Sequence, residues 1–268
     1  MYRFLLAPRW LALHLVVLLA VPAFLLLGKW QFGRYEMRSA NQERTQANLA
    51  APAVPLDRLS TVGGSVDAKL KYRAVTVRGR FDPANELLVR RRTLNGKVGY
   101  HVLTPLVVRD GEAVLVVRGW VPMGPTAEAA PEVPPPATGE VSVTGRLMPA
   151  ETEETTGIAE RSGLPPRQIM LIDPARLGER LPYRLYGGYV QLREQTPPAA
   201  AAPTPLPDPE PDGGGALNLA YSLQWWVFIP IAVGGWIVLI RREARDRKAA
   251  AEAASSGKIS ESHEKVTG

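Results

Sequence analysis

The chain contains two long apolar runs, one near each end, with a more polar stretch of alternating character between them. The first run, Trp10–Leu27, has no charged residue and is about as long as the shortest helices that cross a bilayer core. The second run, Leu217–Ile240, has Trp225 and Trp226 toward one end and Trp236 toward the other. Tryptophan is favoured at membrane–water interfaces because its ring is apolar while its N–H is polar. The pattern predicts transmembrane helices over residues 10–28 and 217–240.

Two interpretations of the first run compete, namely a cleaved signal peptide and a permanent membrane anchor. Arg3 and Arg9 supply the basic start that suits both. A signal peptide has an apolar centre of about 7–15 residues and a small-x-small cleavage site, whereas this run is longer and lacks that site. We therefore expect an uncleaved anchor, in which Pro22 is tolerated as a kink.

Basic residues predict the orientation of the two spans, because lysine and arginine are retained on the cytoplasmic side. Residues 1–9 and 241–268 are therefore predicted to be cytoplasmic, and the chain between the spans extracytoplasmic. The end of the chain, Ala249–Gly268, is small and polar, which predicts a disordered tail. The basic group that precedes this tail consists of Arg241, Arg242, Arg245, Arg247 and Lys248.

The first apolar run ends at Gly28–Arg34, from which a helix without proline is predicted to continue to about Leu49. Trp30, Gln31 and Arg34 mark this junction. They are typical of an interfacial anchor, in which the arginine reaches back to the headgroups. They would equally suit a contact surface for another membrane protein, so both interpretations stay open.

Strand signals fill the middle of the chain, so residues 29–194 are predicted to form a β-rich extracytoplasmic domain that begins with this helical extension. Short alternating segments with tight turns indicate a mainly antiparallel β fold, either a small barrel or a sandwich, with a short helix at Pro174–Arg180. Asn95-Gly96 and Asp110-Gly111 are strong hairpin signals, and Pro105 predicts an interruption or a sheet edge. The predicted strands are Tyr72–Arg80, Glu86–Arg92, Gly99–Arg109, Ala113–Val121, Glu140–Leu147, Gln168–Ile172 and Gly188–Arg193.

Residues 195–216 are rich in proline, alanine and glycine. This proline density excludes a helix and favours an extended, semi-rigid spacer. The glycines Gly213–Gly215 lack the Lys-Ser/Thr pair and the preceding strand of a phosphate-binding loop. We therefore expect a linker between the β-rich domain and the second span.

The composition and motifs contain no catalytic constellation. Cysteine is absent, which excludes disulfides, thiolate metal sites and cysteine nucleophiles. The β-rich segment has one histidine, His101, which we expect to be half-buried in a strand. The carboxylates of Glu151, Glu153 and Glu154 fall in a Thr/Gly-rich segment that is predicted to be a solvated loop. Without a His-Glu-x-x-His or Gly-x-Ser-x-Gly motif, we expect neither an enzyme nor a metal site.

The formal net charge of +6 would by itself suit a nucleic-acid partner. A dense basic cluster lies directly after the second apolar run, where it is a topology signal, so we expect no nucleic-acid binding. In the β-rich domain, Arg90, Arg91, Arg92 and Arg118 predict a basic face. That face is either simply solvated or attracts an acidic lipid or an acidic partner.

Five separated motifs resemble the surfeit-locus type of cytochrome c oxidase assembly proteins. That family shows Gly-x-Trp-Gln-x-x-Arg after its first membrane helix, then a Tyr/Arg strand ending in Gly-x-Phe. A Gly-Tyr/x-Thr-Pro-Leu segment, Arg-Gly-Trp-Val-Pro and a Tyr-Ala-x-x-Trp start to the second helix follow in order. The corresponding segments here are Gly28–Arg34, Tyr72–Phe81, Gly99–Leu106, Arg118–Pro122 and Tyr221–Trp225. Each motif alone is weak, but five in order between two membrane helices form a specific pattern.

The resemblance implies a non-enzymatic assembly factor in the bacterial plasma membrane, which helps to mature the haem-bearing subunit of a haem–copper terminal oxidase. The implied partners are the catalytic subunit of cytochrome c oxidase, other assembly factors and the lipid bilayer. An alternative is a membrane-anchored scaffold or binding domain for another envelope complex; a membrane-anchored hydrolase is a third. The residues expected for docking or at the membrane interface are Trp30, Gln31, Arg34, Arg118, Trp120, Tyr221 and Trp225.

The resemblance also raises transient binding of haem A. In bacterial members this binding has been linked to a histidine three residues before the tyrosine at the start of the second helix. Asn218 stands at that position here, and an amide is a poor iron ligand compared with an imidazole. His14, inside the other apolar run, is the candidate substitute, because an ionisable group within a span is a functional candidate. The simpler account of His14 is a neutral ring that shares a hydrogen bond.

Overall fold

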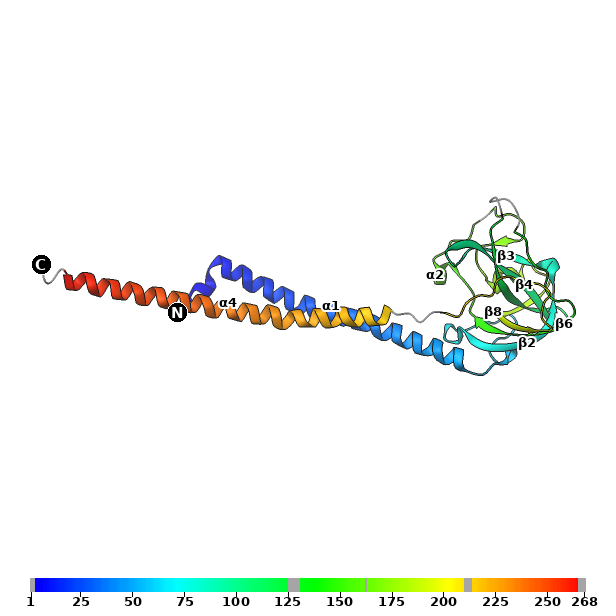
Figure 1. The fold of residues 1–268 in the computed structure, drawn as a ribbon, viewed down its shortest axis with the longest axis horizontal. Helices are drawn as coiled ribbons and strands as arrows, with labels where there is room; N and C mark the ends of the chain where they lie inside the picture. The colour runs from blue at the N-terminus through cyan, green and yellow to red at the C-terminus, as the bar shows by residue number, and fades with distance from the viewer. Residues whose placement is uncertain (1–2, 125–130, 162, 210–213, 265–268) are drawn as a thin grey trace. The chain divides into compact units, whose positions relative to one another are not determined.

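The computed structural model describes residues 3–124, 131–161, 163–209 and 214–264, which belong to two compact units (Figure 1). The helical unit consists of Met1–Asn41 with Pro211–Gly268, and the β domain is Gln42–Glu210. Helix α1 (Pro8–Ala50) continues past the first apolar run and ends one residue beyond the predicted limit. Gly33 does not interrupt it.

The helical unit is an antiparallel pair of α1 and α4 (Gly214–Glu264), with the short helix η1 (Arg3–Leu6) before α1. The two helices run side by side in Figure 1. Arg9 contacts Glu243, His14 contacts Trp236, and the ring of Phe24 stacks on Trp225. Residues progressively later in α1 therefore meet residues progressively earlier in α4, which defines the antiparallel register.

Both helices are long and apolar enough to cross a membrane, judged by length and composition. Their apolar side chains are largely exposed: Leu18 is 69 %, Leu26 68 % and Ile231 61 % accessible. A helix of a water-soluble core would bury such side chains, whereas a lipid environment suits them. The helical unit therefore suggests membrane anchoring.

Helix α4 does not stop at the basic group but continues to Glu264. The sequence predicted disorder over Ala249–Gly268, so this expectation was wrong up to Glu264; residues 265–268 lie outside the described chain. Alanine-rich sequence has the highest intrinsic helix propensity, and it directly extends a helix that is already nucleated.

One sheet of eight strands forms the β domain, in the order β1-β2-β6-β8-β5-β4-β3-β7. All seven predicted strands are present. The eighth, β1, is two residues long and lies between the predicted helical extension and the first predicted strand. The strands are β1 (Val54–Pro55), β2 (Arg73–Phe81), β3 (Leu87–Leu94), β4 (Lys97–Arg109), β5 (Glu112–Pro122), β6 (Glu140–Met148), β7 (Gln168–Ile169) and β8 (Arg184–Thr196).

The strand pairing is mainly antiparallel, as predicted, although β1–β2, β3–β7 and β5–β8 are parallel. Strand β2 pairs with β6 along its length and also with β4 at Arg80 and Phe81. Consequently β2, β6, β8, β5 and β4 each pair with two others in a ring. The sequence left a small barrel or a sandwich open, and the structure has this single curled sheet.

Local chemistry explains several connections. Asn95 and Gly96 both have positive φ, as the tight turn between β3 and β4 requires. Pro105 neither interrupts β4 nor lies at an edge, so that expectation was wrong. It stands where the neighbour of β4 changes from β3 to β2, and its carbonyl accepts a hydrogen bond from Asp82 N–H. The short helices are η2 (Leu56–Arg58), η3 (Ala68–Leu70), η4 (Pro83–Asn85), α2 (Glu153–Thr156) and α3 (Pro174–Gly178).

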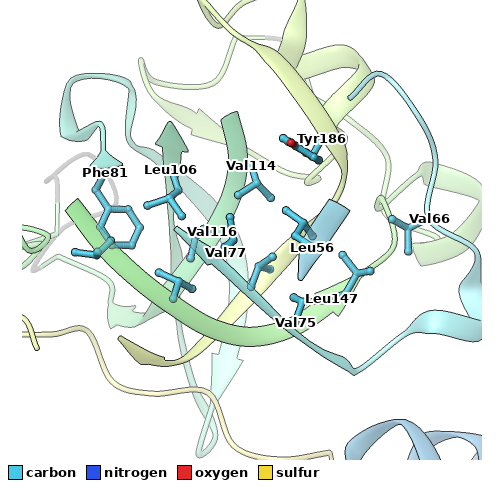
Figure 2. Packing of buried hydrophobic residues seen from close by; sticks show 13 residues of the cluster. Leu56, Val66, Val75, Val77, Phe81, Leu106, Val114, Val116, Leu147 and Tyr186 are labelled. Atoms are coloured by element: carbon cyan, nitrogen blue, oxygen red, sulfur yellow. The ribbon is translucent and has the colours of Figure 1, made fainter. Parts of the chain in front are cut away.

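Apolar side chains form two buried clusters in the β domain, and Figure 2 shows the first of them. Val75, Leu106, Val114 and Leu147 are completely inaccessible to solvent. A second cluster packs around Leu103 and joins strands β3, β4, β5 and β8 to helix α3. Burial of this kind contributes about 1.5–3 kcal/mol per large aliphatic side chain.

The proline-rich segment has no helix over residues 197–209, and it is not a free spacer. The backbone of Thr204 donates to and accepts from that of Trp120, at 2.9 and 2.8 Å. Asp208 forms ion pairs with Arg146 and Arg193. Residues 197–209 therefore belong to the β domain and are not a linker outside it. The proline content of the segment excludes a helix but does not indicate that the segment packs on the domain.

Candidate functional site

The junction of α1 and α4 brings the predicted motifs of the two helices together. Gly28 lies against the indole of Trp226. A Cβ at this position would be 2.1 Å from Trp226 Nε1, so a larger residue would collide with the ring. Phe32 contacts Trp226 with ring centroids 5.8 Å apart, and Phe24 stacks on Trp225 at 5.7 Å. We call these five residues the aromatic junction. The sequence predicted two aromatic-rich segments here, but not that a glycine is the point of closest approach.

Three of the predicted docking residues lie beside this junction: Trp30 and Tyr221 are exposed, and Arg34 is half-buried. Trp30 is 57 % exposed, and Tyr221 is 50 % exposed. The guanidinium carbon of Arg34 lies 5.4 Å above the ring of Trp30, a cation–π geometry. Trp225, by contrast, is half-buried within the aromatic junction. Gln31 is half-buried on the same segment of α1.

His14 lies farther along the helix pair. Trp236 Nε1 donates a hydrogen bond of 2.8 Å to His14 Nδ1, and the two rings meet edge to face. A nitrogen that accepts a hydrogen bond carries no proton, so the neutral ring holds its proton on Nε2. The shared hydrogen bond matches the simpler account of this residue.

This arrangement does not fit an iron ligand. A ligating histidine usually donates its second N–H to an acceptor and binds the metal through the other nitrogen. In His14 the second nitrogen accepts, and Nε2 is the protonated atom. Asn218 lies roughly 27 Å away along α4 from Trp236, the contact of His14, at 1.5 Å per residue. His14 and Asn218 therefore cannot serve one metal ion, and no described imidazole replaces the histidine of the family pattern.

Arg118 lies inside the β domain, with a side chain only 2 % exposed. Its guanidinium donates to Glu86 Oε2 at 2.6 Å, to the hydroxyl of Thr104 at 2.8 Å and to the carbonyl of Pro134 at 2.8 Å. The Thr104 hydroxyl in turn donates to Glu86 at 2.7 Å. This is a fully connected buried network, in which each charge has a partner.

Trp120 is also buried, at 7 % exposed. Its indole N–H donates to the carbonyl of Arg92 at 2.8 Å, while its ring covers Gly99 and its backbone pairs with Thr204. The expectation that Arg118 and Trp120 provide a docking surface is therefore wrong for their side chains. Both are consumed by internal contacts, because every residue of β5 from Ala113 to Val121 is buried.

A second polar network surrounds Glu151, which the sequence assigned to a solvated loop. Arg92 donates to its carboxylate at 2.5 Å, Tyr189 O–H at 3.0 Å and Ile172 N–H at 3.1 Å. Burial, followed by the neighbouring carboxylate of Glu151, raises the pKa of Tyr189 well above its usual value. The loop prediction for Glu151 was wrong because its three partners come from segments distant in the sequence.

His101 lies near this network in strand β4. Burial, followed by the positive charge of Arg92, lowers its pKa from 6.5 to about 3. Its Nδ1 has no hydrogen-bond partner among the described residues. His101 is thus a neutral, half-buried strand residue, as expected from the sequence, and it is not paired with a carboxylate in the described chain.

The helical unit and the β domain together define the class of protein: two long apolar helices, suggestive of membrane anchoring, flank a mainly β domain whose charged networks are internal. The chain belongs to the SURF1 family, whose model matches residues 18–229. It is similar to an uncharacterized SURF1-like protein of Mycobacterium tuberculosis, 31 % identical over 92 % of this chain and 90 % of that protein.

Two named relatives align over shorter segments. Surfeit locus protein 1 of Xenopus tropicalis is 31 % identical over 52 % of this chain and 49 % of its own length. Cytochrome oxidase assembly protein SHY1 of Saccharomyces cerevisiae is 33 % identical over 35 % of this chain and 24 % of its own length. The resemblance inferred from the five motifs is confirmed by these comparisons.

Proposed function

We propose that this protein is a membrane-anchored assembly factor for a haem–copper terminal oxidase and helps its catalytic subunit to mature. The observation that carries the proposal is the family match over residues 18–229, together with the name of the yeast relative as a cytochrome oxidase assembly protein. The two apolar helices support it, because they would hold the protein in the same bilayer as the subunit on which it acts.

In this proposal the exposed surface beside the aromatic junction contacts the oxidase subunit. Trp30 and Tyr221 present large aromatic areas, and Arg34 adds a positive charge. Aromatic and arginine side chains dominate the binding energy of protein interfaces. The β domain lies outside the plasma membrane, and both termini lie in the cytoplasm, as the flanking basic residues favour.

The assistance that we propose covers the stage at which haem enters the subunit, but not ligation of the haem iron by His14. The hydrogen bond from Trp236 to His14 Nδ1 argues against that ligand. Purified protein should therefore bind haem A only weakly, and a His14→Ala variant should keep whatever occupancy the natural chain has. Loss of the haem absorbance in that variant would contradict this part of the proposal.

The deciding experiment is deletion of the gene in its own host, with measurement of haem-A absorbance and cytochrome c oxidase activity in membranes. We expect both to fall and to return when the gene is restored. A normal amount of active oxidase in the deletion strain would overturn the proposal. Co-purification with other envelope proteins, without oxidase subunits, would instead favour the scaffold alternative.

Docking through the junction is tested with a matched pair of variants in the restored strain. Trp30→Ala combined with Tyr221→Ala should lower oxidase assembly, because two exposed aromatic contacts are lost. Leu18→Ala combined with Ile231→Ala removes exposed apolar area of the same two helices away from the junction and should leave assembly unchanged. Equal effects of the two pairs would show that the junction has no special role.

A further inference from the structure

The predicted basic face of the β domain is divided by the fold. Arg118 is paired with Glu86, and Arg92 with Glu151, so neither contributes free charge. Arg90 and Arg91 remain, and they sit at an irregularity of β3. The pairing with β4 passes from Val89 opposite His101 to Arg92 opposite Gly99, so β3 contains one extra residue. Arg91 has a φ of 58°, which is uncommon for a residue other than glycine.

A bulge of this kind changes the direction in which side chains leave a strand, and bulges often occur beside functional sites. Here Arg90 and Arg91 line a cavity of about 650 Å³, together with Arg161. The cavity has the size typical of ligand sites in proteins. The sequence showed three consecutive arginines but could not show that a bulge separates two of them from the third.

The remaining lining of the cavity is apolar. Tyr100 and Met170 are buried, while Val98 and Met123 are 51 % and 40 % exposed. Val98 and Met123 are the two large aliphatic side chains of the β domain that are most exposed among the described residues. Exposed apolar area next to a concentration of positive charge indicates a binding surface that takes an amphipathic group.

The positive charges of this cavity are unpaired. Arg90 donates to the neutral side-chain oxygen of Gln168 and lies 5.8 Å above the ring of Tyr100, which fixes its position without neutralising it. Among the described residues, no carboxylate forms an ion pair with Arg90, Arg91 or Arg161. The cavity around Arg78 and Arg80 differs, because Asp82, Asp110 and Glu140 also line it.

From these observations we infer that the arginine cavity, defined by Arg90, Arg91, Arg161, Val98 and Met123, binds an acidic segment of a partner protein. The segment carries a carboxylate for the guanidinium groups and an adjacent apolar side chain for the rim. Guanidinium groups bind carboxylates through paired N–H donors, and such charge-assisted hydrogen bonds are the strong ones.

A peptide fits the geometry better than an anionic lipid surface does. The positive charges line a hollow, which side chains of a peptide can enter, whereas a bilayer presents a broad plane of headgroups. The inference rests on the proposed function to the extent that the partner is taken to be an oxidase subunit.

The test uses the full-length protein in its own membranes, with the photo-crosslinking residue p-benzoylphenylalanine in place of Met123. We expect an adduct with an oxidase subunit, at a peptide that contains Asp or Glu. Combining the crosslinking residue with Arg91→Glu and Arg161→Glu should lower the adduct yield about tenfold or more, because loss of close charge pairs weakens binding at least that much.

The matched control combines the crosslinker with Arg78→Glu and Arg80→Glu, two exposed arginines in a different cavity, for the same change in net charge. This control should keep the adduct. Equal loss in both combinations, an adduct with lipid only, or no adduct would overturn the inference. The deletion strain separates the two proposals: if oxidase falls there while no adduct forms, the cavity inference fails and the assembly function stands.

Discussion

Arg118 illustrates how a residue in a family-like motif can act entirely within its own domain. Its charge is nearly inaccessible, and its partner Glu86 lies just before strand β3, far away in the sequence. Desolvation of two charges offsets much of their attraction, so such a pair adds little net stability. Its removal is costly for a different reason, because the remaining charge is left buried without a partner.

We therefore predict that Arg118→Met lowers the free energy of unfolding by about 3 kcal/mol, the lower end for breaking a buried ion pair. The measurement is denaturant unfolding of the purified full-length protein in detergent, followed by circular dichroism. Arg109→Met is the matched control. Arg109 is 64 % exposed and pairs with Glu112 at 3.7 Å, so its loss should cost less than about 1 kcal/mol. A small effect of Arg118→Met would contradict the buried network.

His101 predicts a dependence of stability on pH. Its pKa is about 3 in the folded domain and 6.5 in the unfolded chain. Between these values the unfolded state binds the additional proton, so stability is complete above pH 6.5 and falls as the pH falls toward 3. The slope contributed by one such group is at most about 1.4 kcal/mol per pH unit.

The prediction is tested between pH 5 and 6.5, above the usual range of carboxylate titration. As the pH is lowered from 6.5 to 5, the thermal midpoint of the β domain should decrease in the natural protein and should decrease less in His101→Gln. A His14→Gln variant alters a histidine of the helical unit and should keep the natural slope. Identical slopes in the natural chain and His101→Gln would refute the pKa assignment.

At the scale of elements, the contact between α1 and α4 depends on Gly28. Its missing side chain gives room to Trp226, in the way that small residues allow close approach of membrane helices. Gly33, one and a half turns later, has no atom near its Cβ position. The close helix contact therefore requires glycine at position 28, whereas position 33 has room for a larger side chain.

We predict that Gly28→Ala separates the helices and Gly33→Ala does not. Because the chain lacks cysteine, the measurement can use Ser39→Cys with Gly215→Cys, positions that face each other across the pair. Oxidation should form the disulfide readily, and Gly28→Ala should lower its yield several-fold. Both alanines raise helix propensity by a similar amount, about 1 kcal/mol, so Gly33→Ala controls for that effect.

The docked proline-rich segment offers a second test at this scale. Gly119 has a φ of 153°, and a Cβ there would meet the carbonyl of Thr204 at 2.6 Å. Gly119→Ala should release residues 197–209 from the β domain and speed their cleavage by elastase, which acts after alanine. Gly139 also has a positive φ but lies in open space, so Gly139→Ala should strain the backbone without exposing the segment. Equal cleavage rates would contradict docking.

At the scale of the whole molecule, the antiparallel helix pair has a consequence for topology. If α1 and α4 both cross the bilayer, the two ends of the chain must lie on the same side. Asp110→Cys places a single thiol in a turn of the β domain, and Lys248→Cys places one in the basic group. A membrane-impermeant maleimide should label the first in intact spheroplasts and the second only after permeabilisation. Labelling of Lys248→Cys in intact cells would contradict the proposed orientation.

The sequence by itself determined the elements whose signals are local. Apolar runs fixed the two helices, alternation placed seven strands, and Asn95-Gly96 fixed a hairpin, because each signal depends on residues within a few positions of one another. The five ordered motifs also led to the family, which no single motif would have done.

Only the tertiary structure decided which side chains pair across long distances in the chain. It paired Arg118 with Glu86, Arg92 with Glu151 and Trp120 with Thr204, and it set β5 parallel to β8. Such pairings depend on how strands with similar patterns are ordered in the sheet, which local periodicity does not encode. For the same reason, four arginines that looked equivalent became two internal partners and two residues of a cavity.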